Sequence, residues 1–360
     1  MKKQIKAEII ADSISPQDHR LTTYVLTFPR YILAELNTHR LFSKNSASSR
    51  AIPFEKMVEM VMEDPFIPMA FQKNHKGMQG TEYLEGEAVV EAKTQWLLAR
   101  DAAVKRAKHL HNGYTEGVTK QLCNRLLEPF MWHTVILTAS EFENFFNLRC
   151  PRYDPGDGVI NKSKEDSLVR LKTSMEGTDV DFGSFFLSSN DWLLANKGMS
   201  EIHMMELAEC MWDAINESEP KKLEEGEWHI PFGDDLFKPS GNLYEDLTAP
   251  AVFDMKDIPT GQTLDEYIGE LKRKIATARC ARVSYGNFEG KDDYKADIKL
   301  YERLSTSGHY SPFEHCAKAM SDLEYGAFTH TYINKEGAKV KERGWCRNYR
   351  GFIQLRNQID

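Results

Sequence analysis

The segment from Glu87 to His111 most constrains the fold of this chain, because it contains no Gly or Pro and is rich in Ala, Leu, Lys and Glu. These residue types have favourable helix propensities, so the segment is predicted to form one long helix. Shorter helices are predicted nearby, at Tyr31 to Leu36, at Thr115 to Leu127 just ahead of Pro129, and at Glu141 to Leu148. We therefore expect a helical bundle in this part of the chain.

Strands are predicted in two segments, Thr22 to Phe28, which is β-branched and aromatic, and Ala317 to Tyr332. Further helices are predicted at Glu201 to Ile215, Leu264 to Arg282 and Asp292 to Thr306. The expected fold class is α/β in the broad sense, that is α+β, with a helical bundle and a mainly antiparallel sheet.

Two segments interrupt this pattern of helices and strands. Residues 151–198 contain several Pro and Gly residues, including the run from Pro155 to Gly158, and are expected to be an insertion. Residues 217–262 are expected to be a linker, since they include the charged run from Lys221 to Gly226. We expect residues 1–360 to form one domain, in which residues 12–149 and 199–216 make one block and residues 263–360 another.

Composition and charge limit the functions open to the chain. With 41% hydrophobic and 28% charged residues the sequence is an average globular one, and its net charge of -8 gives no general attraction for nucleic acid. The six cysteines include no Cys-x-x-Cys pair, so we expect neither a metal site nor a disulfide framework. The apolar run from Ala7 to Ala11 includes Glu8 and is far shorter than a signal or membrane segment, so a cytoplasmic protein without a membrane partner is expected.

An anionic ligand would therefore have to be held by local arginines. A guanidinium matches two phosphate oxygens, and such charge-assisted hydrogen bonds are about twice as strong as neutral ones. The candidates are Arg40, Arg50, Arg125 and Arg149. Small polar residues stand between the first two of these, namely Ser43, Asn45, Ser46, Ser48 and Ser49. Their hydroxyl and backbone N–H groups suit a phosphate or a pyrimidine ring, although the same residues taken alone also fit an ordinary Ser-rich loop.

Two short motifs near opposite ends of the chain decide between these interpretations. Asn37-Thr38-His39-Arg40 is followed by Ser48, Ser49 and Arg50, and His309-Tyr310-Ser311-Pro312-Phe313-Glu314-His315 lies towards the C-terminal end. Together they resemble the flavin-dependent thymidylate synthases, whose signature is an Arg-His-Arg triplet followed at a fixed distance by Ser, and preceded by His-x-x-Pro-Phe-Glu-His. In this chain the order of the two motifs is reversed.

The resemblance implies roles for individual residues of the first motif. The family's loop is shared between flavin and dUMP, which assigns His39, Arg40 and Asn45 to the flavin and Ser48, Ser49 and Arg50 to the nucleotide. Asn144-Phe145-Phe146-Asn147-Leu148-Arg149 is similar to a family helix whose Asn touches flavin and whose last Arg holds the nucleotide. By the same resemblance Glu35 and Arg125 join the nucleotide group, and Ser48 and Arg149 are the residues expected to act closest to the chemistry.

The C-terminal part resembles the block that opens the usual family sequence. Ala278 to Tyr285 is similar to an Ala-Arg-Val-Ser segment and contributes Ser284, while the second motif contributes His309, Ser311 and Glu314 to the flavin group. Ser311 stands where Thr is common in the family. Glu201-Ile202 is similar to the Glu-Ile that closes the nucleotide block. The simplest account of the reversed order is circular permutation with an enlarged chain, which proteins tolerate where the termini lie close together at the surface.

Three departures from the family pattern alter the expected contacts with flavin. Thr38 replaces the first Arg of the triplet, Ser46 replaces a Glu, and Thr138 with Ser140 replace an Asn and an Arg. The C-terminal run Arg347-Asn348-Tyr349-Arg350 repeats the Asn-x-Arg spacing, so our hypothesis is that Asn348 and Arg350 supply the missing flavin contacts. A basic tail that packs on a neighbouring element is the alternative.

The activity that the resemblance implies is transfer of a one-carbon unit to C5 of a deoxypyrimidine monophosphate, dUMP to dTMP, with FAD as cofactor and NADPH and 5,10-methylenetetrahydrofolate as co-substrates. The family's sites form between the subunits of a homotetramer, so a homo-oligomer is expected. The family needs no cysteine nucleophile, and we interpret Cys150 as a buried thiol. Two alternatives stay open: methylation or hydroxymethylation of dCMP or another pyrimidine nucleotide, and a catalytically silent nucleotide-binding protein.

Overall fold

The core of the fold is a five-stranded sheet in the order β3-β4-β2-β1-β5. Its strands are β1 (Lys6–Ile14), β2 (Arg20–Pro29), β3 (Ser43–Ser46), β4 (Trp132–Ala139) and β5 (Lys221–Lys222). Neighbours are antiparallel, except that β1 and β5 run parallel. The computed structural model describes residues 3–77, 80, 82–113, 115–153, 159–174, 200–233, 258–285 and 293–359.

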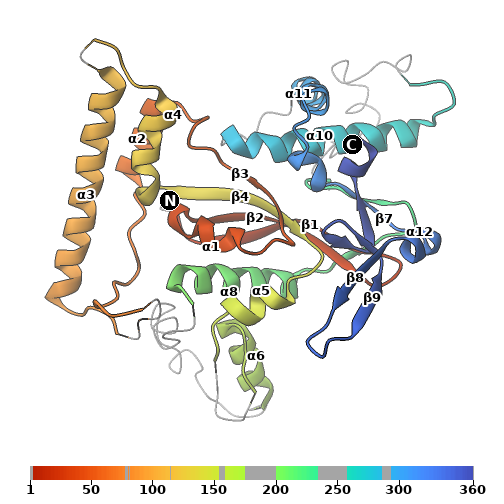
Figure 1. Cartoon of the computed structure of the whole chain (residues 1–360), viewed down its shortest axis with the longest axis horizontal. Helices are drawn as coiled ribbons and strands as arrows, with labels where there is room; N and C mark the ends of the chain where they lie inside the picture. The colour runs from red at the N-terminus through yellow and green to blue at the C-terminus, as the bar shows by residue number, and fades with distance from the viewer. Residues whose placement is uncertain are drawn as a thin grey trace.

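Helices cover both faces of this sheet (Figure 1). α8 (Ile202–Glu217) and α5 (Glu143–Arg149) lie on one face, and α10 (Leu264–Arg282) with the 3-10 turn η5 (Val283–Tyr285) lies on the other. Side chains of a strand point alternately to the two faces. Leu26 of β2 accordingly packs in the cluster that contains the α8 side chains, whereas its neighbour Val25 packs with residues of α10 and η5. The sheet is therefore buried on both faces.

A helical lobe stands beside the sheet (Figure 1). It contains α2 (Phe54–Glu63), α3 (Glu87–Asn112), α4 (Lys120–Cys123) and the 3-10 helix η2 (Asn124–Phe130). α3 buries Val104 and Ala107 against this lobe and leaves most of its other side chains exposed. The turn η1 (Arg30–Ile32) and α1 (Leu33–Asn37) connect β2 to β3.

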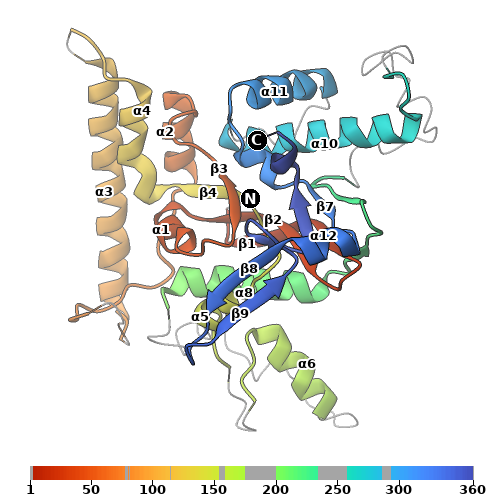
Figure 2. The same ribbon diagram turned by 45° about the vertical axis from the view of Figure 1, so that its right-hand side comes forward.

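The C-terminal part forms a second layer around a three-stranded sheet, β12-β7-β6. α11 (Tyr294–Thr306) packs on α10 and is followed by the 3-10 turn η6 (Ser311–Glu314). The remaining elements are β6 (Trp228–His229), β7 (Ala317–Ala319), α12 (Asp322–Ala327), β8 (Thr329–Ile333), β9 (Lys339–Arg343), β10 (Trp345–Cys346), β11 (Tyr349–Arg350), β12 (Phe352–Gln354) and η7 (Leu355–Gln358). In Figure 2, α10 and α11 lie on the opposite side of the central sheet from α8, α5 and α6 (Lys164–Ser174).

The structure confirms the α+β class, the mainly antiparallel sheet and most predicted helices. α10 has the predicted bounds, because Thr263 and Glu266 form a capping box at its start. The predicted strand Ala317 to Tyr332 is wrong: β7 ends at Ala319, and Ser321 caps a short helix before β8 begins. The predicted helix from Thr115 is also wrong in extent, since Thr119 caps only one α-helical turn before the chain continues as a 3-10 helix.

The expected insertion and linker are only partly described. Residues 154–158 and 175–198 of the insertion lie outside the described residues, and α6 is the helix described between them. Within the expected linker, β5 pairs with β1 and β6 pairs with β7, so two short parts of it belong to the two sheets. Residues 234–257 lie outside the described residues.

Candidate functional site

The edge strand β3 is where the two sequence motifs meet. One side of β3 pairs with β4, and η5 and η6 pack near its other side. The Ser48 amide donates to the Ser284 carbonyl at 3.1 Å, and Ser284 Oγ donates to the Ser46 carbonyl at 3.3 Å. Asn45 Nδ2 donates to the Cys280 carbonyl at 3.3 Å. Segments separated by more than two hundred residues of sequence are thus joined by direct hydrogen bonds.

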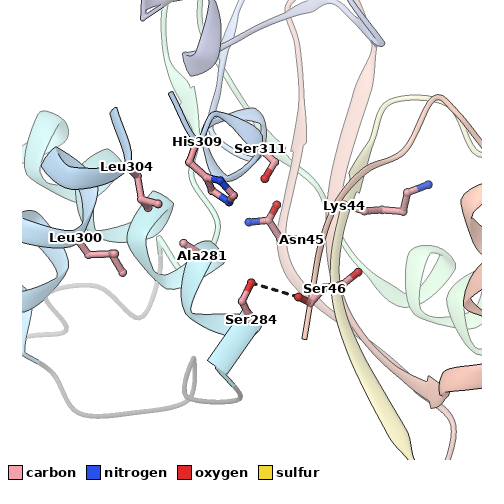
Figure 3. A pocket seen from close by; sticks show the side chains of 9 residues that line it. All are labelled: Lys44, Asn45, Ser46, Ala281, Ser284, Leu300, Leu304, His309 and Ser311. Atoms are coloured by element: carbon pink, nitrogen blue, oxygen red, sulfur yellow. Dashed lines mark hydrogen bonds between the residues drawn. The ribbon is translucent and has the colours of Figure 1, made fainter. Parts of the chain in front are cut away.

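A cavity of about 240 Å³ opens at this junction (Figure 3). Its polar lining comes from Lys44, Asn45, Ser46, Ser284, His309 and Ser311. Its apolar lining comes from Ala281, Leu300 and Leu304. Figure 3 shows the Asn45 amide between the His309 side and the Ser284 side of the cavity. Gly308 ends α11 with a φ of 71°, a left-handed conformation that suits glycine, and so turns His309 towards the cavity.

The chemistry of this lining suits a flat heteroaromatic ring. An amide, an imidazole and two hydroxyls can bond the polar edge of such a ring, while Leu300 and Leu304 can pack against its face. Pockets for drug-sized ligands run from about 300 Å³ upwards, so a cavity of about 240 Å³ accommodates one ring system and not a whole dinucleotide.

A second group of predicted residues surrounds the loop after β3. Ser49 is buried, and its Oγ donates to Glu128 Oε1 at 2.5 Å. Glu128 also lies 3.7 Å from Arg30 and 3.9 Å from Arg125. Arg50 and Arg125 are exposed. The loop and η2 therefore each present one accessible guanidinium group, and the Ser49 hydroxyl between them is held by Glu128.

A third group lies around α1 and α5. Arg149 Nε donates to His39 Nε2 at 3.2 Å, and Arg149 NH1 donates to Ser200 Oγ at 3.2 Å. Burial, reinforced by the positive charges of Arg149 and Lys44, lowers the pKa of His39 to about 4. His39 is therefore neutral at pH 7 and its Nε2 accepts the arginine bond, which leaves the proton on Nδ1. Lys44 Nζ donates to the His39 carbonyl at 3.1 Å, and burial lowers the pKa of this lysine as well.

Glu35 is also on α1, and its Oε2 is buried without a hydrogen-bond partner among the described residues. Arg40 and Asn144 are exposed near the ends of α1 and α5. These residues leave polar groups available to a ligand or to another chain, but no described contact brings them to the β3 cavity.

The C-terminal run from Arg347 to Arg350 anchors the start of β3 through hydrogen bonds. Asn348 Nδ2 donates to the Leu41 carbonyl at 2.9 Å and to Ser43 Oγ at 3.0 Å, and its Oδ1 accepts from Gln354 Nε2 at 2.7 Å. The Arg350 amide donates to Ser140 Oγ at 2.8 Å. Both groups of Asn348 that could contact flavin are thus already bonded to protein.

Two arginines of the C-terminal part have contacts of their own, and one of them, Arg356, holds the turn η6. Arg356 NH1 donates to Glu314 Oε1 at 2.6 Å, so this predicted flavin ligand is ion-paired within the chain. The Arg350 guanidinium lies 5.9 Å from the centre of the Trp345 ring, and its Nε is buried without a hydrogen-bond partner among the described residues.

A chain of hydrogen bonds through the core ties η6 to the central sheet. His315 Nδ1 lies 2.8 Å from Thr138 Oγ1 on β4, which lies 2.7 Å from Thr23 Oγ1 on β2. His229 continues the chain, with Nε2 2.8 Å from Thr23 Oγ1 and Nδ1 2.9 Å from Ser13 Oγ. Burial lowers the pKa of His229 to about 4 and that of His315 to about 3. Both rings are therefore neutral at pH 7.

The structure also bears on residues with no assigned chemistry. Burial raises the pKa of the Cys150 thiol far above its ordinary value, so the thiolate that a nucleophile needs is not formed near pH 7. Trp96, Trp132 and Trp212 pack against the core clusters, as predicted.

Within the described ranges, no three His, Cys, Asp or Glu side chains are grouped to hold a metal ion. In the same part of the chain, no helix combines the length and the apolar character that a membrane span requires.

Asn45, Ser284, His309 and Ser311 are the predicted residues that the structure brings together in one cavity. Ser48 and Ser49 lie in the adjoining loop, whereas Arg149 contacts His39. Sequence reasoning missed Lys44 and the aliphatic wall of α11. Lys44 was hidden because a lysine in a Ser-rich stretch gives no sign of burial. Leu300 and Leu304 carried only the ordinary helical spacing of an apolar face.

Comparisons with known proteins add little to this geometry. No family model matches the chain, and no curated protein matches it. Among solved structures, UMP/dUMP methylase PolB from Streptomyces cacaoi bound with 5-Br UMP has 14% identity and a TM-score of 0.34, over 56% of this chain and 98% of its own. The same enzyme bound with 5-Br dUMP has 12% identity and a TM-score of 0.34, over 56% of this chain and 99% of its own. A likeness of this size carries no argument about function.

Proposed function

We propose that the protein is a flavin-dependent enzyme that transfers a one-carbon unit to C5 of a deoxypyrimidine monophosphate, with dUMP as substrate and dTMP as product. The observation that carries the proposal is the cavity at β3, where residues of the two family-like motifs line one surface. A chance match of either motif would not require the two to meet in space. Their reversed order in the sequence, together with this meeting, also supports circular permutation as the origin of the chain.

The cavity fits the ring of a flavin. Asn45, Ser284, His309 and Ser311 would bond its polar edge, and Leu300 with Leu304 would cover part of one face. When bound, FAD would supply the hydride and one-carbon chemistry, with NADPH and 5,10-methylenetetrahydrofolate as co-substrates. The cavity walls would fix the orientation of the ring, which is the contribution of the protein itself to the reaction.

The loop after β3 would hold the nucleotide. Arg50 and Arg125 are exposed and can each offer a guanidinium fork to a phosphate. The Ser48 backbone N–H donates a hydrogen bond to the carbonyl of Ser284, which lines the cavity, and so holds Ser48 next to it. The loop and the cavity are thus neighbours, so a nucleotide held by the loop would lie next to a flavin ring held in the cavity.

Arg149 would act on the nucleotide from a different copy of the chain. Its partners in this chain are His39 and Ser200, and no described contact joins it to the loop from Ser48 to Arg50. We therefore propose a homo-oligomer, a tetramer by resemblance, in which the Arg149 group of one copy faces the loop of another. Neutral His39 leaves the full charge of Arg149 available to a phosphate, because it accepts one N–H of the guanidinium without neutralising it.

A flavin titration tests this proposal. Purified protein is titrated with FAD while visible absorbance and flavin fluorescence are followed, for the native chain, for H309A with S311A, and for the control H330A. His330 is an exposed histidine on the β8–β9 hairpin and does not line the cavity. We expect saturable binding that the double variant weakens and the control leaves unchanged. Equal affinity for all three proteins, or no binding by any of them, would contradict the proposed cofactor site.

The titration repeated with dUMP and with dCMP identifies the base. A change in the flavin spectrum with dUMP alone supports dUMP as the substrate. A change with dCMP alone transfers the proposal to methylation or hydroxymethylation of dCMP. FAD binding that neither nucleotide perturbs indicates a protein that has kept the cofactor site without the reaction.

A further inference from the structure

A second cavity, of about 350 Å³, lies between α10 and α11. It shares Leu300 with the β3 cavity, so the same side chain forms a wall of both. Its other lining residues are Arg282 from α10 and Ala296, Lys299 and Arg303 from α11. Three of its five lining residues are therefore cations, in a chain whose net charge is -8.

The two cations on α11 have no structural partner in the described part of the chain. Lys299 and Arg303 are exposed, and neither forms an ion pair with a carboxylate that the structure describes. They stand four residues apart on one helix, a spacing at which like charges repel and destabilise the helix. A local arrangement that costs stability without a structural gain is typical of a functional site.

The third cation is held rigidly. Arg282 Nε donates to Asp297 Oδ1 at 2.5 Å, and the Asp297 side chain is almost fully buried. Asp297 thereby fixes the guanidinium at the cavity wall while engaging one of its five N–H donors, so other donors of Arg282 stay free for a ligand. A preorganised cation costs a ligand less ordering than a flexible one.

We propose that this cavity binds the diphosphate of the flavin dinucleotide whose ring occupies the neighbouring β3 cavity. The inference rests on the proposed function and assigns Arg282, Lys299 and Arg303 to a part of the cofactor that the first cavity is too small to hold. The two unpaired cations, Lys299 and Arg303, match the two negative charges of a dinucleotide diphosphate, and Arg282, already ion-paired with Asp297, adds hydrogen-bond donors. They also supply positive charge to a chain that has Thr38 where the resemblance expects an arginine.

The test compares ligands that carry the ring, the diphosphate or both. FAD contains both, riboflavin has the ring without phosphate, and ADP has the diphosphate without the flavin ring. The test variant is K299Q with R303Q, and the matched control is K105Q with R106Q on the exposed face of α3. Both variants remove two positive charges from an exposed helix surface, and α3 lies in the helical lobe at the left of Figure 1, well separated from α11.

We expect K299Q with R303Q to weaken FAD and ADP binding by at least about tenfold, because two charge-assisted hydrogen bonds are lost. Riboflavin should bind this variant and the native chain alike, and the control should change none of the three affinities. The thermal unfolding midpoint should not fall, since the substitutions remove a repulsive pair. This rules out unfolding as the cause of weaker binding.

Failure of the inference can be told apart from failure of the proposed function. FAD affinity that is equal for the variant and the native chain overturns the inference while the flavin site stands. If the native chain binds no flavin, the proposed function fails, and the ADP titration alone tests the diphosphate site. ADP binding by the native chain that the variant loses supports a diphosphate site. ADP binding that the variant retains, or no ADP binding by the native chain, overturns the diphosphate site.

Discussion

Replacing His315 by Asn should make the stability of the protein less sensitive to acid. His315 is fully buried at the end of η6, and its Nδ1 bonds Thr138 Oγ1. The Asn side chain can place an amide group near the position of Nδ1, so H315N keeps this bond and removes the titratable ring. The variant is expected to be less stable at pH 7.5, because the smaller side chain leaves a cavity.

The pH dependence follows from the lowered pKa. Burial lowers the pKa of His315 to about 3, whereas the same ring in the unfolded chain titrates near its ordinary value of 6.5. Below pH 6.5 the unfolded state binds a proton that the folded state does not, so acid removes stability until the pH reaches the folded pKa. Between pH 7.5 and pH 5 this amounts to about 2 kcal/mol for a single histidine, and H315N does not lose it.

The assay is urea unfolding of the native chain and of H315N at pH 7.5 and at pH 5. Other groups that titrate in this range, among them Glu206 and Glu209, whose pKa values burial raises to about 7, contribute equally to both proteins and cancel in the difference. The stability advantage of the native chain should shrink by about 2 kcal/mol on going to pH 5. An advantage of equal size at both pH values would refute the reasoning.

Three further predictions concern the site. N348A should lower the free energy of unfolding by about 1–3 kcal/mol in urea titrations, because it leaves the Gln354 amide without its partner and removes a hydrogen bond to the buried Ser43 hydroxyl; an unchanged stability would contradict the anchoring role. R50A should weaken dUMP binding and leave FAD binding unchanged in calorimetry, and a loss of FAD affinity alone would reverse the assignment of the loop. C150A should retain turnover, since the thiol is buried and protonated; an inactive variant with native stability would show that a thiol takes part.

The parts of the fold that were predictable are those that local sequence decides. α3 follows from a run without Gly or Pro, and the start of α10 from a capping box formed by neighbouring residues. The segment after η6 was not predictable in the same way. Ala317 to Ala319 is a strand because it pairs with β6 and β12, and nothing within the segment encodes that pairing.

The candidate site likewise contains residues that local sequence predicts and residues that only the fold brings to it. Asn45, Ser284, His309 and Ser311 could be proposed from motifs, because the resemblance assigns a role to each position. The partly buried position of Lys44 shows only in the folded chain, and the anchoring role of Asn348 depends on contacts between segments far apart in the sequence. Lys299 and Arg303 looked like ordinary surface cations, and only the packing of α11 on α10 places them beside the cavity.

The central claim is one-carbon transfer to a pyrimidine nucleotide. The most direct test is mass spectrometry of the nucleotide after the FAD-loaded protein is incubated with NADPH, 5,10-methylenetetrahydrofolate carrying an isotopic label on its one-carbon unit, and dUMP or dCMP. The account predicts labelled dTMP from dUMP, at a rate that H309A with S311A reduces and H330A does not. Nucleotide recovered without label from a protein that binds FAD would contradict it.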